Sequence, residues 1–214
     1  MDAPWPLTTW LEVAVAAVAL GVALSLQPWR MLRGGLISPT LAVLVLLPGL
    51  WLLPQHLPQG LALQLSGASL TLLMLGWPLA VPVLAAVAAT VWLLGTATGT
   101  AVLSQYVWVG LVPATVALAV GGALRRWLPP HVFIYTLGRG FLGTAVAMFV
   151  AGVMHEVTYH WLGGNTLQDA LVARWLMAWG DAFLTGLLTA VFVAFAPQWL
   201  ATWSDARYLK PPTA

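Results

Sequence analysis

Long apolar stretches, separated by short groups of Pro, Gly and charged residues, run through the chain from one end to the other. A helix needs about 20 apolar residues to cross the hydrocarbon core of a bilayer, with a range of roughly 17 to 25. Divided at its breaks, the pattern predicts seven membrane-spanning helices. They cover approximately residues 8–27, 40–53, 61–75, 79–94, 101–124, 132–161 and 171–196.

The second, third and fourth of these segments are the shortest. The second contains Pro48, and a Gly76-Trp77-Pro78 corner separates the third from the fourth. Backbone that is not a complete helix is tolerated at membrane depth where the rest of the protein buries it. Any of these three segments is therefore open to being broken or re-entrant.

The composition supports a chain that is dissolved in lipid. Hydrophobic residues make up 61% of the 214 residues, charged residues only 7%, and the mean hydropathy is +0.91. Soluble domains carry roughly a quarter of their residues as charges, and disordered chains are poor in apolar residues, so both classes are excluded. We expect an all-α, polytopic integral membrane protein in which residues 1–214 form a single transmembrane domain.

The basic residues predict an orientation. With seven spans and the N-terminus outside, the cytoplasmic side receives six of them and the outer loops receive none, in agreement with the positive-inside rule. The six are Arg30, Arg33, Arg125, Arg126, Arg207 and Lys210. We therefore expect a multi-pass protein of the cell membrane with a cytoplasmic C-terminus. The net charge of +2 is too small to indicate a nucleic-acid partner.

Several kinds of chemistry have no sequence support. The chain contains no Cys, so no disulfide or thiolate site can form. A phosphate-binding loop, a dinucleotide fingerprint and an HExxH pair are absent. We expect no enzymatic activity, no intrinsic cofactor and no ATP site, so any active transport would take its energy from a partner or an ion gradient.

Ionisable residues inside the spans are expensive in hydrocarbon, which makes them candidates for function. Glu12 lies in the outer turns of the first span, where it can reach the outer interface or simply snorkel towards it. Arg139 lies two turns into the sixth span from the inner side, from which its side chain can snorkel towards cytoplasmic phosphates.

The outer end of the sixth span is rich in polar groups. Glu156 and His160 are four residues apart and share a helix face, as do His155 and Tyr159. Imidazole, carboxylate and the nearby Met154 thioether form a plausible ligand set for a divalent transition metal. The alternative is a hydrated helix end at the membrane interface.

Asp181 falls near the centre of the seventh span, and Arg174 lies on the same face two turns further out. A charge pair or a water-filled cavity would satisfy both side chains. We therefore expect one of two roles for Asp181. It takes part in substrate handling or partner coupling, or it makes a purely structural hydrogen bond between helices.

Two further patterns concern packing. Small residues at four-residue spacing favour close helix contacts within the chain, or docking to another membrane subunit. Trp residues near span ends are typical of an interfacial aromatic belt. The small residues are Ala17, Gly21 and Ser25 in the first span and Gly143, Ala147 and Ala151 in the sixth. The Trp residues are Trp10, Trp29, Trp51, Trp77, Trp127, Trp161 and Trp199.

One segment resembles a known family. Residues 67–80 read GASLTLLMLGWPLA, which is similar to the GxxLxxLxxGxxxA segment of CbiM/NikM-type permeases, the substrate-binding components of energy-coupling factor transporters. Residues 130–135, 180–186, 197–203 and 207–209 look like the shorter CbiM-like branch, so the resemblance covers most of the chain from about residue 8.

The resemblance implies seven spans with the N-terminus outside and capture of cobalt or nickel on the outer side. It also implies a transmembrane coupling subunit and paired ATPases as partners. In metal-binding members the ligands come from an N-terminal Met-His segment and from a third-span His. Here the chain starts Met1-Asp2-Ala3-Pro4, and Gln64 stands at the His position. Gln is a weaker ligand than imidazole for such metals.

Three interpretations follow from these departures. The chain binds a metal differently, through His155, Glu156 and His160, or it carries another small solute, or it is an accessory subunit of a larger membrane assembly. Transport predicts a polar, outward-facing cavity reached by Gln64, Glu12 and Asp181. An accessory role predicts that these groups are sealed and that an exposed helix face is available to a partner.

Overall fold

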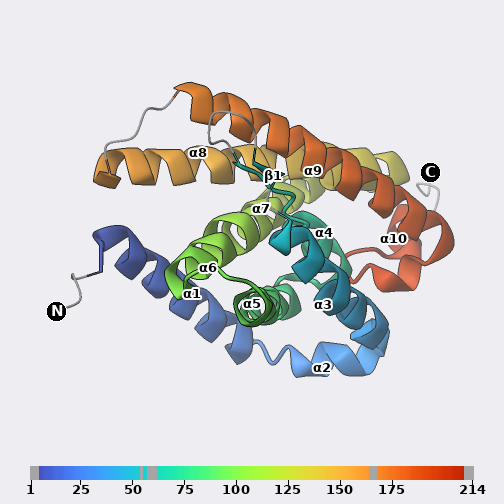
Figure 1. Cartoon of the computed structure of the whole chain (residues 1–214). Coiled ribbons are helices and arrows are strands. Elements are labelled where there is room, and N and C mark those ends of the chain that lie inside the picture. The colour runs from blue at the N-terminus through green and yellow to red at the C-terminus, as the bar shows by residue number, and fades with distance from the viewer. Residues whose placement is uncertain (1–4, 54, 57–61, 164–167, 210–214) are drawn as a thin grey trace.

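The computed structural model describes residues 5–53, 55–56, 62–163 and 168–209, which are mostly helical (Figure 1). In chain order the helices are α1 (Leu7–Ser25), α2 (Trp29–Met31), η1 (Leu32–Leu36), α3 (Ile37–Leu52), α4 (Ala68–Leu75), α5 (Trp77–Leu94), α6 (Gly99–Gln105), η2 (Tyr106–Leu111), α7 (Val112–Trp127), η3 (Ile134–Leu142), α8 (Gly143–Gly163), α9 (Gln168–Phe195), η4 (Pro197–Trp199) and α10 (Asp205–Tyr208). The elements η1, η2 and η3 are wider π-helical turns continuous with their neighbours. Two short strands, β1 (Gln55–His56) and β2 (Ala62–Leu63), pair antiparallel.

Five helices are long and apolar enough to cross a membrane: Leu7–Ser25, Trp77–Leu94, Gly99–Trp127, Ile134–Tyr159 and Leu171–Phe195. The prediction of a helical protein with membrane-length helices is confirmed. The two remaining expected spans are shorter, because α3 has 16 residues and α4 has only 8. The chain therefore contains five full-length apolar helices, a shorter apolar helix and a half-length helix within the described residues.

The prediction of a helix over residues 61–75 was wrong in its extent, because the chain is helical only over Ala68–Leu75. Gly67 precedes the helix with a φ of 63°, and Gly76 ends it with a φ of 73°. Both angles lie in the region that glycine adopts at little cost, so one glycine delimits each end of α4. At 1.5 Å per residue the helix is roughly 12 Å long, less than half of a bilayer core.

The middle of the bundle is formed by α4 and α5, with the α8–α9 pair along one side and α1 to α3 along the other (Figure 1). Leu72 and Leu75 of α4 and Leu84 and Val87 of α5 are at most 1% exposed. Because α4 is surrounded by protein, its ends and its polar groups are removed from lipid.

Small residues bring η3, α8 and α9 close together. A Cβ atom at Gly140 would lie 3.0 Å from the Thr189 side chain, and one at Gly152 would lie 2.9 Å from that of Arg174. Ala147 and Ala151 are also buried. The expectation that the sixth-span stripe packs within the chain is confirmed.

The stripe in α1 behaves differently. Ala17, Gly21 and Ser25 are exposed, and a Cβ atom at Gly21 would meet nothing within 4 Å. The expectation of packing within the chain was therefore wrong for this helix, as far as the described residues go.

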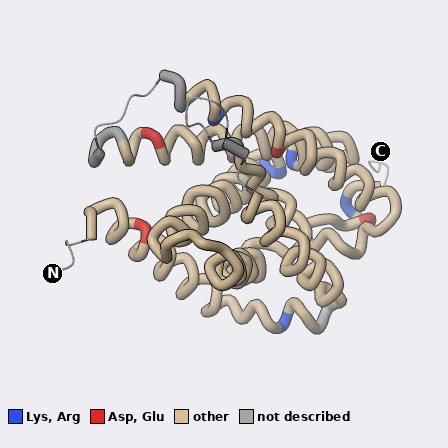
Figure 2. The backbone as a smooth tube through the Cα atoms, in the orientation of Figure 1, with Lys and Arg blue, Asp and Glu red and all other residues tan. Residues whose placement is uncertain are grey.

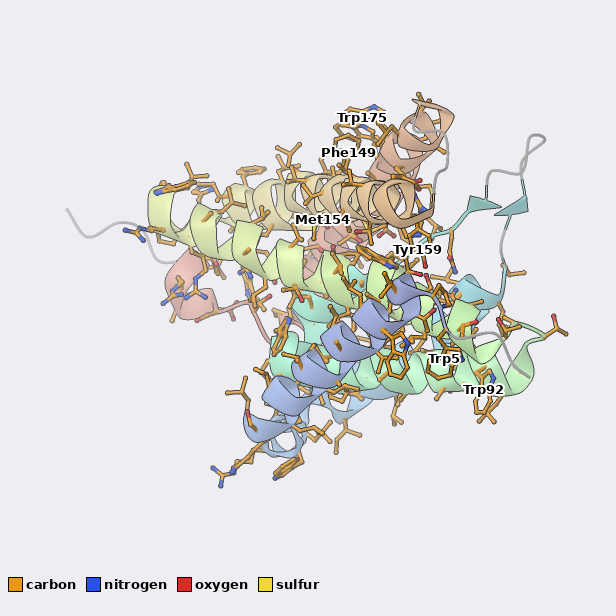
Figure 3. The ribbon with its side chains drawn as sticks, turned by 90° about the vertical axis from the view of Figure 1, so that its left-hand side faces the viewer. Trp5, Trp92, Phe149, Met154, Tyr159 and Trp175 are labelled. Carbon is orange, nitrogen blue, oxygen red and sulfur yellow. The ribbon has the colours of Figure 1, made fainter. Side chains whose placement is uncertain are left out.

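The surface is apolar, and the charged residues are isolated positions along the backbone (Figure 2). Phe183, Leu187 and Phe195 point outwards from α9 with exposed fractions of 66%, 65% and 84%. Trp5 and Trp92 also lie at the surface (Figure 3). Such a surface suits hydrocarbon and interface rather than water.

Among the Trp residues assigned to the aromatic belt, Trp10, Trp29 and Trp127 are exposed, as expected. Trp51 is a correction, since it is only 2% exposed and belongs to the core. The side chain of Trp161 lies outside the described part.

Candidate functional site

Gln64 lines a cavity between α3, the segment before α4, and α9. The cavity has a volume of about 280 Å³. Its walls are mainly leucine, and its functional groups are the Gln64 amide and the Met177 thioether. Of Gln64, Glu12 and Asp181, which were expected to reach a polar cavity, Gln64 is the one that lines this mainly apolar cavity. The lining residues are Leu50, Leu53, Gln64, Leu65, Leu176, Met177 and Gly180.

Asp181 lies directly after Gly180 but does not line this cavity. Its side chain is fully buried, and Oδ1 accepts hydrogen bonds from the backbone N–H groups of Ser66 at 3.2 Å and Gly67 at 3.1 Å. These groups are at the N-terminal end of α4, where the helix dipole favours a negative charge. Asp181 therefore fixes the position of the Gln64–Gly67 segment through two backbone hydrogen bonds.

Ser66 connects the same segment to η2. Its Oγ donates to the carbonyl of Val109 at 2.5 Å and accepts from the N–H of Ala68 at 3.0 Å. Val109 is four residues before Pro113, and Pro113 has no N–H with which to make the usual helical bond to that carbonyl. The proline thus leaves an acceptor that the Ser66 hydroxyl uses.

Trp51, at the end of α3, fixes the segment from another side. Its Nε1 donates to the Ser66 carbonyl at 2.9 Å. Its own carbonyl accepts from the Nε2 atoms of Gln64 at 3.3 Å and Gln105 at 3.1 Å. A helix leaves its last carbonyls without intrahelical donors, and the two glutamines satisfy this one. The amide nitrogen of Gln64 therefore makes a structural hydrogen bond to Trp51, and the Gln64 side chain also lines the cavity.

The interior face of α9 carries further polar groups. Asp181, Thr185 and Thr189 are four residues apart and buried; in the described structure Asp181 Oδ2 and both threonine hydroxyls have no hydrogen-bond partner. Thr185 also lines a second, almost wholly apolar cavity of about 280 Å³ between α3, α4 and α9. The helix thus presents a polar stripe to the core beside α4.

Glu12 is the centre of a separate network. Its Oε1 accepts from Trp108 Nε1 and from the Tyr159 hydroxyl, both at 2.8 Å, and the Tyr159 oxygen lies 3.2 Å from Ser104 Oγ. Figure 3 shows Tyr159 on α8 beside α1. Glu12 is only 1% exposed. The expectation that it reaches the outer interface or a cavity was wrong, because the carboxylate ties α1 to η2 and α8 instead.

His155, Glu156 and Arg174 form a second cluster between α8 and α9. Arg174 Nε donates to Glu156 Oε1 at 2.9 Å, and Arg174 Nη2 lies 3.0 Å from His155 Nδ1. His155 Nδ1 is also 3.1 Å from Glu156 Oε1. Because Nδ1 lies between a donor and an acceptor, it can serve only one of them in each tautomer. The His155 ring stacks on Tyr159 with 4.5 Å between centroids, which joins the two clusters.

Of the predicted metal ligands His155, Glu156 and His160, the structure describes the side chains of the first two. Among the described residues, no three His, Asp or Glu groups are placed to hold a metal ion. Arg174 occupies the Glu156 carboxylate and adds a positive charge that opposes a cation there. His160 belongs to α8, but its side chain lies outside the described part. Arg174 pairs with Glu156 rather than with Asp181, which corrects the expected charge pair.

Sequence reasoning missed Ser66, Trp51, Trp108 and Gln105, which hold the charged residues in place. The signal for Ser66 was present, since Pro113 predicts a free carbonyl four residues earlier. No comparable local signal marks the other three, because their partners lie far away in sequence.

Comparisons with models of protein families, with curated proteins and with solved structures found no match to this chain. The candidate site is therefore described from the structure itself. It is a small, mainly apolar cavity lined by the Gln64 amide and the Met177 thioether, and the buried Asp181 carboxylate fixes the backbone next to Gln64.

Proposed function

We propose that this chain is the substrate-binding membrane subunit of an energy-coupling factor importer, with a divalent transition-metal ion of the cobalt or nickel type as its cargo. One observation carries the proposal. Gln64, which stands where the CbiM/NikM-type resemblance places a metal-binding His, lines a cavity of about 280 Å³. The chain performs no chemistry on its cargo and depends on a coupling subunit and paired ATPases for energy.

In the proposed topology all seven apolar segments contribute to a cell-membrane bundle with the N-terminus outside. The five long helices and α3 cross the bilayer, and α4 with its preceding segment forms the third, shorter element. Arg30 in α2, Arg125 at the end of α7 and Arg207 in α10 support a cytoplasmic location for those three ends.

The cavity offers the cargo two neutral donors, the Gln64 carbonyl oxygen and the Met177 sulfur. Thioether sulfur suits softer metals, and amide oxygen is a weaker ligand than imidazole. Such a site releases its ion readily, which suits a subunit that passes its cargo on. Glu12, His155, Glu156 and Asp181 support the bundle around this site rather than binding the ion.

Uptake of nickel or cobalt by cells that express the chain with its partners tests the proposal. We expect Gln64→Ala and Met177→Leu to lower uptake, and Gln64→His to increase metal retained by the purified protein, because imidazole is the better ligand. Gln198→Ala, in the exposed turn η4, is the matched control. Unchanged uptake and retention in all three cavity variants would contradict this cargo site.

A second function has its own support. Glu12 and Asp181 are sealed at 1% and 0% exposure, and the small residues Ala17 and Gly21 leave one face of α1 uncovered in the described structure. Both features suit an accessory subunit of a larger membrane assembly. Purification in mild detergent separates the two functions: recovery of an ATPase pair with bound metal supports the importer, and recovery of an unrelated membrane complex supports the accessory role.

A further inference from the structure

A third cavity, which is lined by basic residues, lies where α7 ends, η3 begins and α10 packs. Its volume is about 210 Å³. Three arginines from three separate elements line it: Arg125 from the last turn of α7, Arg139 from η3 and Arg207 from α10. Among the described residues no Asp or Glu lines it. The cavity therefore concentrates positive charge.

Arg139 forms the floor of this cavity. It is only 7% exposed, and its Nε and Nη1 atoms have no hydrogen-bond partner in the described part of the chain. The sequence predicted an arginine that snorkels out to phosphates, whereas the side chain is enclosed by protein. An arginine keeps its charge in proteins, and a buried charge without a counter-ion is costly. Arg139 thus contributes to the cavity a buried positive charge that has donor groups free to bind an anion within the described residues.

The surroundings of Arg139 are arranged to hold its guanidinium in place. The guanidinium carbon lies 5.3 Å from the centre of the Tyr135 ring, which is a cation–π contact. A Cβ atom at Gly121 would lie 2.8 Å from Arg139 Nε, so glycine leaves the space that the guanidinium fills. Tyr135 is itself fixed, since its hydroxyl lies 2.8 Å from Thr202 Oγ1.

The rim is open and basic. Arg125 and Arg207 are exposed, and Leu128 beside them is an exposed apolar residue. Guanidinium groups bind phosphate oxygens through paired, charge-assisted hydrogen bonds. Basic pockets between membrane helices on the cytoplasmic side bind anionic lipid headgroups.

We propose that this cavity binds a phosphate-type oxyanion, with Arg139 on the floor and Arg125 and Arg207 on the rim. The phosphate group of an anionic lipid and free inorganic phosphate share this chemistry. The site is independent of the cargo cavity and of the proposed importer function, since it shares no lining residue with the Gln64 cavity.

Titration of the delipidated full chain in neutral detergent tests the proposal, with the unfolding temperature and Trp fluorescence as readouts. One arm adds short-chain phosphatidylglycerol, with phosphatidylcholine as its blank. The other adds sodium phosphate, with sodium chloride at equal ionic strength as its blank. Saturable stabilisation by phosphatidylglycerol alone identifies a lipid headgroup site, and saturation in both arms identifies a general oxyanion site. No saturable response in either arm overturns the proposal.

Three variants assign the response to the cavity. We expect Arg139→Gln to weaken binding by at least about tenfold, because it removes a charged hydrogen-bond donor, and Arg207→Gln to weaken it severalfold. Arg30→Gln, an exposed arginine in α2 with the same change of charge, should bind as the unmodified chain does. If Arg139→Gln fails to fold, Arg207→Gln carries the test. Equal losses in Arg207→Gln and Arg30→Gln overturn the proposal, since they indicate attraction to net charge alone.

Discussion

The carboxylate of Asp181 lies 3.1 Å from the backbone nitrogen of Gly67, although 114 residues separate the two in the chain. The same oxygen also accepts from the N–H of Ser66. One buried side chain in α9 thus accepts from the N–H of Gly67, which a helix leaves unpaired at its N-cap, and from the N–H of the residue before it. This contact fixes the beginning of α4 and, through it, the Gln64 side of the cavity.

Two substitutions of Asp181 distinguish the contribution of its negative charge from that of its hydrogen bonds. We expect Asp181→Ala to lower the free energy of unfolding by about 1.5–3 kcal/mol, because two buried N–H groups lose their acceptor. Asp181→Asn keeps an acceptor oxygen and should cost clearly less. Thermal unfolding in detergent measures both variants. If Asn and Ala are equally damaging, the negative charge rather than the acceptor holds α4.

Gly67 tolerates no side chain for two separate reasons. Its φ of 63° disfavours other residues by roughly 1–2 kcal/mol, and a Cβ atom would lie 2.6 Å from Leu47 Cδ1. We expect Gly67→Ala to destabilise the chain and the added change Leu47→Ala to leave the backbone cost in place. Gly21→Ala, within α1 where a Cβ would meet no described residue within 4 Å, should instead stabilise by about 0.5–1 kcal/mol. A neutral Gly67→Ala would contradict the left-handed start of α4.

Glu12 and Tyr159 should be energetically coupled. The Tyr159 hydroxyl donates to Glu12 Oε1 at 2.8 Å, so Tyr159→Phe should cost about 1–2 kcal/mol of unfolding free energy. In a Glu12→Ala background the same change should cost much less, because its acceptor is gone. A double-mutant cycle on unfolding temperature measures the coupling. Strictly additive effects would mean that the bond does not form.

The contributions of Glu156 and Arg174 to stability should be coupled, because the two side chains form an ion pair. Their side chains are 13% and 25% exposed. Glu156→Gln leaves a guanidinium without its partner and should cost about 1–3 kcal/mol, allowing for the partial exposure. The double variant Glu156→Gln with Arg174→Gln should be less destabilised than the sum of the singles. Thermal unfolding of the two single variants and the double variant measures these losses in stability. A loss in the double variant that exceeds the sum of the two single losses would contradict the ion pair.

The sequence predicted the long helices well because hydropathy and length alone define them. It failed at α4, where Leu72, Leu73 and Leu75 are buried by neighbouring helices rather than by lipid. Both environments select the same apolar residues, so hydropathy cannot tell a half-length core helix from a full span. Gly67 and Gly76 were the local signal for its ends, but a glycine in an apolar run often only permits close packing.

The candidate site was predicted as a set of residues but not as an arrangement. Glu12 and Asp181 were recognised because a charge inside a span needs a partner, and both have partners. The sequence did not show that those partners are an indole 96 residues away and a backbone N–H group 114 residues away. Trp108 is one of thirteen Trp residues, so the sequence does not single it out as the partner of Glu12. Every residue except proline has a backbone N–H, so the sequence does not identify which one binds Asp181.

The other end of α4 is also held from a distance. The N–H groups of Ala201 and Thr202 donate to the carbonyls of Met74 and Leu73 at 2.9 and 3.3 Å, and Thr202 Oγ1 donates to Leu73 as well. With Asp181 at its start, α4 depends at both ends on residues made more than a hundred positions later. During synthesis on the ribosome, these contacts at the two ends of α4 can form only after Asp181 and Thr202 have been added to the chain. The helix at the middle of the bundle is then among the last elements to reach its final state.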